Sequence, residues 1–266
     1  MLKDITIGQY LPGNSVVHAL DPRTKILIIL AFIITLFTVG NMAGYLVMAL
    51  FLAHVVKTAK IPFKMMVKSL KPLLFFIIFT AVINLFMTKG TPVFSWGIIT
   101  ITKEGIYLMI SMSLRLIFLV AGTSVLTYTT SPIVLTDGIE SLLKPLGKIG
   151  FPAHEIAMMM TIALRFIPTI IDETDKIMKA QSARGSDFES GSLIHRAKAL
   201  IPILVPLFIS AFRRADDLAT AMECRCYRGG ENRTKLKQIK MTKIDAGAFL
   251  YTAIVFGVVI LLNFII

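Results

Sequence analysis

Residues 175–185, DKIMKAQSARG, and residues 216–226, DDLATAMECRC, decide how the chain is organised. Placed over one another with a constant offset of 41 positions, the two stretches share an aspartate, an alanine and an arginine. Each stretch ends an amphipathic pattern of helical period, and each carries its arginine between small residues. The sequence therefore predicts two helices with similar cationic tips, which suits a protein that binds two similar partners.

The two tips are Ala183-Arg184-Gly185 and Cys224-Arg225-Cys226. An arginine in a last helical turn is common, so either tip alone is better explained as an ordinary helix end. Two such tips on neighbouring helices favour a binding role, because small neighbours let a helix end enter a groove. The guanidinium then supplies five donors for carboxylates or carbonyls. Gly185 and the pair Gly229-Gly230 are predicted to stop the two helices.

Prolines mark where these helices begin. Pro152 is predicted to begin the first helix and Pro168 to kink it, whereas Pro202 and Pro206 lie near the start of the second. Ser131-Pro132 begins a shorter helix upstream. Acidic and basic side chains at helical spacing follow Pro168, as on an exposed helix. Residues 129–245 are therefore expected to form a helical coupling region outside the bilayer.

The rest of the chain is apolar in long blocks. It has 266 residues, of which 55% are hydrophobic, and a mean hydropathy of +0.76, which is typical of polytopic membrane proteins. We expect an all-α membrane protein with a four-helix membrane part in residues 1–128 and a fifth, C-terminal span in residues 246–266. The five predicted spans are 26–39, 43–56, 72–87, 106–128 and 246–266.

Basic residues predict the orientation. The formal net charge is +12, but the lysines and arginines adjoin apolar blocks, which the positive-inside rule explains without a nucleic-acid partner. The loop 57–71 has five lysines and no acid, whereas the loop 89–103 has two lysines. We therefore expect the N-terminus and residues 129–245 in the cytoplasm and the C-terminus outside.

The same five lysines suggest a second property. Lys60, Lys64 and Lys68 recur at intervals of four, beside apolar Ile61 and Met65, as on a helix that lies in the membrane interface. Ordinary cytoplasmic lysines that anchor a loop explain this pattern better than a specific lipid or partner site.

Two polar side chains fall within predicted spans. An arginine at the centre of a span costs roughly 2.5 to 3.5 kcal/mol, so Arg115 is a candidate functional residue. The alternative is a structural partner, such as a backbone carbonyl. Asn84 is a weaker candidate of the same kind.

Known catalytic and metal-binding patterns are missing from the sequence. Cys224 and Cys226 are separated by one residue with no nearby histidine, so no metal site is predicted. Gly147-Lys148 lacks the upstream glycine of a phosphate-binding loop, and no predicted span contains an acidic residue. The chain is expected to be no enzyme and to need no cofactor.

Several motifs resemble those of the transmembrane T components of energy-coupling factor (ECF) transporters, a branch of the ATP-binding-cassette importers. The likeness runs over the whole length and includes LDPRTK at 20–25, ALRFIP at 163–168, QSARG at 181–185, FRRAD at 212–216 and MECRCYRGG at 222–230. In that family two coupling helices end in Ala-Arg-Gly or a close variant. The cysteines beside Arg225 depart from that pattern.

The resemblance implies partners and a location. Arg184 and Arg225, with Ala183, Gly185, Cys224 and Cys226, would dock into grooves of two ATP-binding-cassette ATPase subunits. One substrate-binding S component would hold a vitamin or a cobalt or nickel ion, in a prokaryotic plasma membrane. The rival hypothesis is a stand-alone permease or membrane enzyme with its site around Arg115 and Asn84, against which the lack of intramembrane acids counts.

Overall fold

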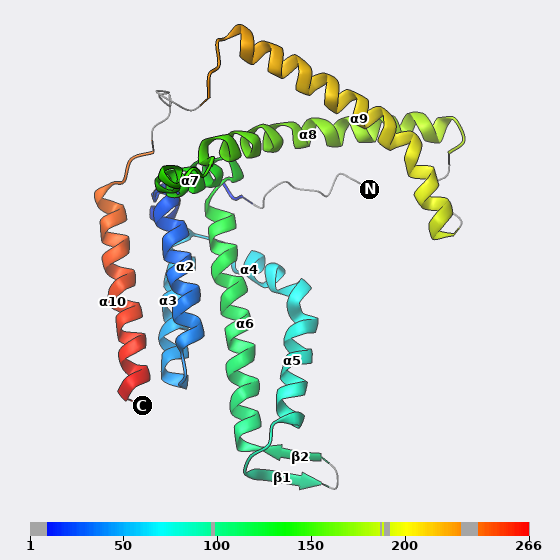
Figure 1. Ribbon diagram of the computed structural model, residues 1–266. Coiled ribbons are helices and arrows are strands. Elements are labelled where there is room, and N and C mark those ends of the chain that lie inside the picture. Colours follow the sequence, from blue (N-terminus) through cyan, green and yellow to red (C-terminus); the bar gives the residue numbers. More distant parts are fainter. Residues whose placement is uncertain (1–9, 97–98, 187, 189–191, 230–238, 266) are drawn as a thin grey trace. The chain divides into compact units, whose positions relative to one another are not determined.

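The computed structural model describes residues 10–96, 99–186, 188, 192–229 and 239–265 (Figure 1). The chain divides into two compact units. One is a helical bundle formed by Gly8–Gly138 together with Gln238–Ile266. The other, Ile139–Lys237, is dominated by two long helices. The C-terminal helix thus joins the N-terminal bundle, although about a hundred residues separate them in sequence.

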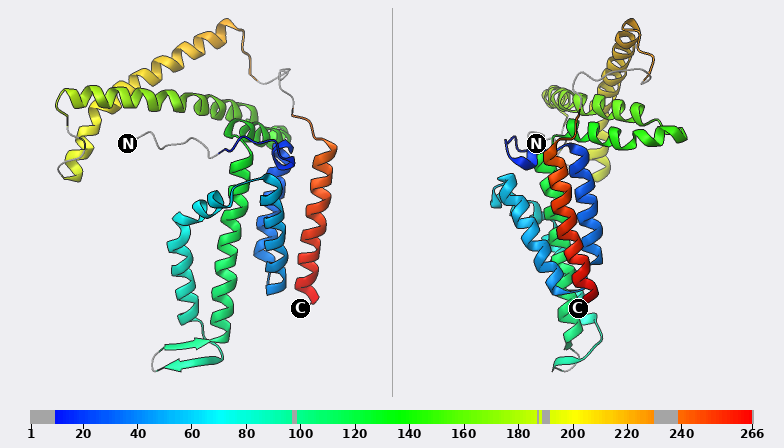
Figure 2. Two further views of the ribbon diagram at one scale, coloured as in Figure 1. Left: turned by 180° about the vertical axis from the view of Figure 1, so that it is seen from behind. Right: turned by 90° about the vertical axis from the view of Figure 1, so that its left-hand side faces the viewer.

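The bundle is almost entirely helical. Its elements are α1 (Val16–Ala19), α2 (Pro22–Thr38), α3 (Met42–Ala59), α4 (Phe63–Leu70), the 3-10 turn η2 (Lys71–Leu73), α5 (Leu74–Met87), α6 (Lys103–Thr129) and α10 (Lys243–Ile265). Figures 1 and 2 show α2, α3, α6 and α10 side by side, and both α6 and α10 contact α2 and α3. The expected helices are confirmed, as is the short one, α4, among the lysines of the loop 57–71.

Side-chain caps explain where the bundle helices begin. Asp21 accepts the backbone N–H of Arg23 at the start of α2, and Pro22 occupies the first helical position. Asn41 caps α3 by accepting from Gly44, and Thr102 caps α6 in the same way. Each cap satisfies a backbone donor that the helix itself leaves unpaired.

The connection between α5 and α6 contains a hairpin. Strand β1 (Pro92–Trp96) pairs antiparallel with β2 (Ile99–Thr102). Glu104, in the first turn of α6, accepts both the backbone N–H and the hydroxyl of Thr91. The sequence suggested only a loop here, because the paired segments are four and five residues long.

Aromatic and aliphatic side chains from four helices form the main core. They are Phe32, Leu36 and Val39 of α2 and its C-terminal end, Tyr45, Met48 and Phe51 of α3, Phe118 of α6, and Phe256 and Val259 of α10. Gly122 allows this contact, because a Cβ there would lie 2.6 Å from the ring of Phe32. Helix association in lipid depends on such close contact, since no hydrophobic effect separates the helices from the acyl chains.

Five helical segments of the described residues are long and apolar enough to cross a membrane, judged by length and composition. They are Met42–Ala59, Phe63–Met87, Lys103–Thr129, Ala153–Ala183 and Lys243–Ile265. Four of them overlap spans that the sequence predicts. The other predicted span corresponds to α2, which has only 17 residues. Helix α8 (Ala153–Ala183) is long and apolar enough to cross a membrane because of its apolar N-terminal half. Length and composition thus select the same number of spans but a different set.

The second unit carries the paired tips. Its helix α8 (Ala153–Ala183) runs without interruption through Pro168, and α9 (Leu193–Cys224) contains both Pro202 and Pro206. Two elements precede α8 in the sequence: α7 (Pro132–Leu143) and the 3-10 segment η3 (Lys144–Ile149). The residues of α7 up to Gly138 belong to the bundle unit. Pro202 and Pro206 lie inside α9 and not at its first residue, because the helix begins nine residues before Pro202.

Candidate functional site

The first tip is a complete helix-ending motif. Arg184 is the C-cap of α8, and Gly185 follows in the left-handed conformation, with φ of +91°. The N–H of Gly185 donates to the carbonyl of Ser182, and the N–H of Ser186 donates to that of Gln181, both at 3.0 Å. This is the Schellman arrangement, which reverses the chain directly after the capping residue. The helix stop predicted at Gly185 is confirmed.

The second tip repeats this arrangement without a glycine. Arg225 is in the position equivalent to Arg184, and Cys226 takes the left-handed conformation with φ of +54°. The N–H of Cys226 donates to the carbonyl of Glu223 at 2.8 Å, and that of Tyr227 donates to Met222 at 3.0 Å. The helix stop predicted at Gly229-Gly230 was wrong, because α9 already ends at Cys224; Gly230 lies outside the described residues.

Both arginines are presented to the surroundings. Arg184 and Arg225 are exposed, as are Ala183, Gly185 and the two cysteines. Among the described residues, neither guanidinium has a hydrogen bond or ion pair. Because the backbone turns away immediately after each arginine, each side chain lies at the extreme end of its helix with its donors unused.

The two helices cross as an antiparallel pair (Figure 1). Near the crossing, Arg214 of α9 donates to Glu173 of α8 at 2.7 Å. Gln181, near the end of α8, donates to the carbonyl of Pro202, near the start of α9, at 3.5 Å. These contacts place the C-terminal ends of the two helices on opposite sides of the crossing.

A histidine holds the chain that follows the second tip. His154 Nε2 lies 3.4 Å from the hydroxyl of Tyr227, and His154 Nδ1 lies 3.0 Å from a carboxylate oxygen of Glu140. Tyr227 directly follows the left-handed Cys226. The start of α8 therefore contacts the chain that follows α9. The contact between Gln181 and Pro202 joins the two helices at the other end of the pair.

Arg115 has internal partners in the bundle. Its Nη2 donates to the carbonyl of Val39 at 3.3 Å, and its guanidinium carbon lies 5.4 Å from the ring centroid of Phe37. The carbonyl of the next residue, Gly40, accepts from the hydroxyl of Tyr107. These contacts are the structural alternative that the sequence left open. They stabilise the turn between α2 and α3.

Asn84 also bonds locally. Its side-chain amide donates to the carbonyl of Thr80 at 2.8 Å, one turn earlier in α5. Its own backbone carbonyl accepts from the hydroxyl of Thr88 at 2.6 Å. The described residues provide no contact between Asn84 and Arg115 that would make them one site.

Comparison with known proteins identifies the family. A family described as cobalt transport protein matches residues 13–236. An energy-coupling factor transporter transmembrane protein EcfT of Ruminiclostridium cellulolyticum is 56% identical over 265 residues, covering 100% of this chain and 99% of the relative. The EcfT of Thermosediminibacter oceani is 60% identical over 253 residues, covering 95% and 96%. The EcfT of Bacillus subtilis is 48% identical over 246 residues, covering 92% and 93%.

The chain belongs to the family of ECF transporter transmembrane proteins. It is a T component, a membrane subunit of a transporter complex that contains other subunits. The relatives are named as transporter membrane subunits and not as enzymes. The resemblance based on the LDPRTK segment and the two arginine tips is thereby confirmed.

The T component also contains a buried network that the sequence did not single out. Asp245, 1% exposed, accepts the backbone N–H of Asp21 at 2.8 Å. Its other oxygen accepts the N–H and hydroxyl of Thr242, the residue directly before α10, so this carboxylate caps the start of the helix. Asp21 in turn forms an ion pair with Arg23 at 3.0 Å, and Arg23 donates to the carbonyl of Ile239.

This network joins the starting points of α2 and α10. The threonine at 242 and the acid at 245 have the spacing of a capping box, and this signal could have suggested Asp245 as a structural residue. Its hydrogen bond to Asp21, 224 positions away, could not be predicted from any spacing in the sequence. Part of the LDPRTK segment therefore serves to fasten the C-terminal helix.

Metal ligands do not gather in the part of the T component that the structure describes. No group of three or more histidine, cysteine, aspartate or glutamate side chains is placed to hold an ion there. Cys224 and Cys226 are free thiols on either side of Arg225.

Proposed function

We propose that this T component couples ATP hydrolysis by two ATP-binding-cassette ATPase subunits to substrate uptake through an S component. The observation that carries the proposal is the repeated helix end. Two exposed arginines cap two antiparallel helices, each followed by the same pair of backbone hydrogen bonds. Two such tips fit a pair of ATPase subunits in which each subunit has one equivalent groove.

The spacing of the tips supports two separate docking sites. Arg184 is 11 residues beyond Glu173, and Arg225 is 11 residues beyond Arg214, the two residues that meet near the crossing. At 1.5 Å per residue, each arginine lies about 16 Å from the crossing, in opposite directions along the pair. A single groove therefore cannot hold both tips, and each tip requires its own ATPase subunit.

The remaining assignments follow from this arrangement. Residues 129–245 form the cytoplasmic coupling region, and residues 1–128 and 246–266 form the membrane part, with the N-terminus in the cytoplasm. ATP binding and hydrolysis belong to the partner subunits. The S component selects the substrate, a vitamin or a transition-metal ion, in a prokaryotic plasma membrane.

Charge reversal at the tips tests the proposal. Arg184→Glu and Arg225→Glu would each remove an arginine anchor of about 2 to 4 kcal/mol and place a carboxylate in a groove shaped for a cation. We expect each variant to weaken ATPase binding and the double variant to abolish uptake. Arg213→Glu, an exposed arginine of α9 near the crossing, is the matched control.

Pull-down of the ATPases and substrate uptake by proteoliposomes are the two measurements. Uptake by the double variant at the level of the unmodified complex would refute the docking role. The rival hypothesis is tested by reconstituting the T component alone. We expect neither uptake nor nucleotide hydrolysis, and either activity in the pure chain would support a stand-alone permease or enzyme.

A further inference from the structure

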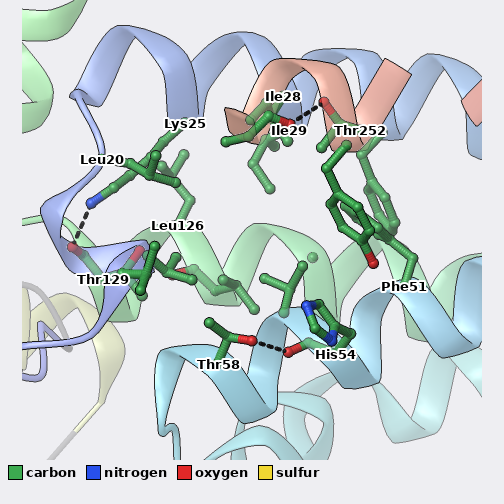
Figure 3. Close-up of a pocket in the computed structure, with 18 of the residues that line it drawn as sticks. Leu20, Lys25, Ile28, Ile29, Phe51, His54, Thr58, Leu126, Thr129 and Thr252 are labelled. Carbon is green, nitrogen blue, oxygen red and sulfur yellow. Dashed lines mark hydrogen bonds between the residues drawn. The ribbon is translucent and has the colours of Figure 1, made fainter. Parts of the chain in front are cut away.

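A cavity of about 390 Å³ lies within the bundle, among α1, α2, α3, α6 and α10 (Figure 3). Aliphatic and aromatic side chains form most of its wall, including Ile28, Ile29, Phe51 and Leu126. Its volume is in the range of pockets that bind small molecules. The cavity is separate from both arginine tips and from Arg115, so the proposed function does not account for it.

Lys25 and the threonines of the cavity wall are already bonded. Lys25 directs its ammonium away from the open space, where it donates to the carbonyls of His18 and Thr129 and to the hydroxyl of Thr130, at 3.0 to 3.2 Å (Figure 3). The three threonine hydroxyls of the wall, those of Thr58, Thr129 and Thr252, each donate to a backbone carbonyl of their own helix.

These bonds determine what the cavity can hold. An ordered water needs two to four polar partners, and the bonded lysine and threonines supply few. Two other polar lining side chains, His54 and Tyr251, are exposed and lie together, with ring centroids 5.5 Å apart. A polar ligand would lose its hydration without replacement bonds, so the wall selects an apolar occupant.

The surroundings supply such an occupant. Helices α3, α6 and α10 are long and apolar enough to span a membrane, so we expect their outer faces to contact lipid. On α10, a Cβ added to the lining residue Gly247 would meet no atom within 4 Å. The space beside this residue is therefore open. An unfilled cavity would forfeit the dispersion contacts that hold helices together in lipid.

Positive charge adjoins the same wall. Lys57 directly precedes the lining residue Thr58 near the end of α3, and Lys243 directly precedes the lining residue Ile244 at the start of α10. Both lysines are exposed. Lysines beside an apolar pocket at a membrane boundary attract the phosphate of an anionic lipid.

We infer that this cavity binds one acyl chain of an anionic phospholipid, whose phosphate lies near Lys57 and Lys243. The acyl chain fills the cavity beside residues 244–252 of α10, whereas Phe256 and Val259 of the same helix pack directly in the main core. Polar contacts fasten α10 at its two ends, through Asp245 at the start and through Asn263, which accepts from Gly40 and donates to Thr38. Between these two ends of α10, the acyl chain supplies the apolar contacts that the cavity lacks.

Photolabelling tests the site directly. The protein is placed in nanodiscs of phosphatidylethanolamine and phosphatidylglycerol, the latter carrying a diazirine near the middle of one acyl chain. We expect cross-links in peptides that contain residues 51–58 and 244–252, in excess over the lipid-facing surface of α5. Labelling spread evenly over all lipid-exposed helices would overturn the proposal. Labelling that is lost when partner subunits bind would assign the cavity to a partner and would also contradict it.

Two matched glycine variants provide the control. Gly247→Leu fills the cavity, whereas Gly257→Leu adds the same side chain to the same helix, also with no atom within 4 Å of the new Cβ, at a position that does not line the cavity. We expect Gly247→Leu to lower cross-linking at residues 51–58 about tenfold and Gly257→Leu to leave it unchanged. Equal labelling of the two variants would contradict the proposal, and thermal unfolding of both verifies that they fold.

Native mass spectrometry gives an independent measurement. We expect one phosphatidylglycerol to remain bound to the unmodified chain after detergent exchange, and to be lost in Gly247→Leu. Replacing both Lys57 and Lys243 by glutamine should exchange the retained phosphatidylglycerol for phosphatidylethanolamine. No retained lipid in the unmodified chain would exclude a specific site.

Discussion

Glu173 and Arg214 form an ion pair near the crossing of α8 and α9, although they are 41 positions apart, the same offset that relates the two arginine tips. Equivalent residues of a repeat can contact each other only near an axis that exchanges the two copies. The paired helices therefore approximate a two-fold arrangement about this ion pair. This symmetry gives Arg184 and Arg225 equivalent positions, as the proposed docking to two ATPase subunits requires.

Exchanging the charges of this ion pair tests whether it holds α8 and α9 together. The side chains of Arg214 and Glu173 are 36% and 24% exposed, so the pair should contribute about 0.5 to 1 kcal/mol. We expect Glu173→Arg and Arg214→Glu each to lower the free energy of unfolding by about that amount, and the double exchange to restore most of it. Thermal unfolding in detergent measures the cycle, and strictly additive losses would show that the pair is not coupled.

The left-handed residues at the two tips should respond oppositely to substitution. Gly185→Ala places a Cβ at φ of +91°, and we expect a loss of about 1 kcal/mol. Cys226→Gly relieves a non-glycine residue at φ of +54°, and we expect a gain of about 0.5 kcal/mol. Cys224→Ala, at a regular helical position, is the control and should change little. Destabilisation by Cys226→Gly would show that the thiol itself contributes at this tip.

Asp245 should be critical for attachment of α10. Asp245→Asn keeps the shape but removes the charge and one of the two acceptor oxygens, so we expect a loss of about 2 to 3 kcal/mol. Asp217→Asn, an exposed acid on α9, is the matched control and should stay within about 0.5 kcal/mol of the unmodified protein. Thermal unfolding of both variants in the same detergent is the measurement. Similar values for the two would disprove the importance of the buried network.

Arg115 is expected to act on stability. Arg115→Leu removes the bond to the Val39 carbonyl, and we expect a loss of about 1 to 2 kcal/mol, with uptake per folded transporter preserved. Asn84→Leu, which removes an amide bonded within α5, serves as the comparison. Loss of uptake in a fully stable Arg115→Leu variant would instead support a direct role of the arginine in transport.

The predicted orientation is testable by labelling. In a background with Cys224 and Cys226 replaced by serine, a membrane-impermeant thiol reagent added outside cells should label cysteines introduced at positions 90 to 100. It should not label Lys64→Cys, because the basic loop 57–71 is expected inside. Labelling of Lys64→Cys in intact cells, and not only after permeabilisation, would reverse the orientation.

Sequence alone determined the local structure of this protein and its family. Long apolar blocks predicted the helices of the bundle, since a helix satisfies its own backbone groups in lipid. The offset of 41 positions identified both tips, and Gly185 located the end of α8 correctly because glycine adopts the left-handed conformation at no steric cost. These properties depend on neighbouring residues, so they can be recognised in a linear sequence.

Only the tertiary structure decided how distant segments meet. Cys226 ends α9 where no glycine stands, because two backbone hydrogen bonds impose the left-handed conformation there. The bond from Asp21 to Asp245 joins residues 224 positions apart, and the bond from Arg115 to Val39 gives an intramembrane cation a backbone partner. A buried polar group must find a partner wherever the fold brings one within reach, and chain separation does not encode that choice.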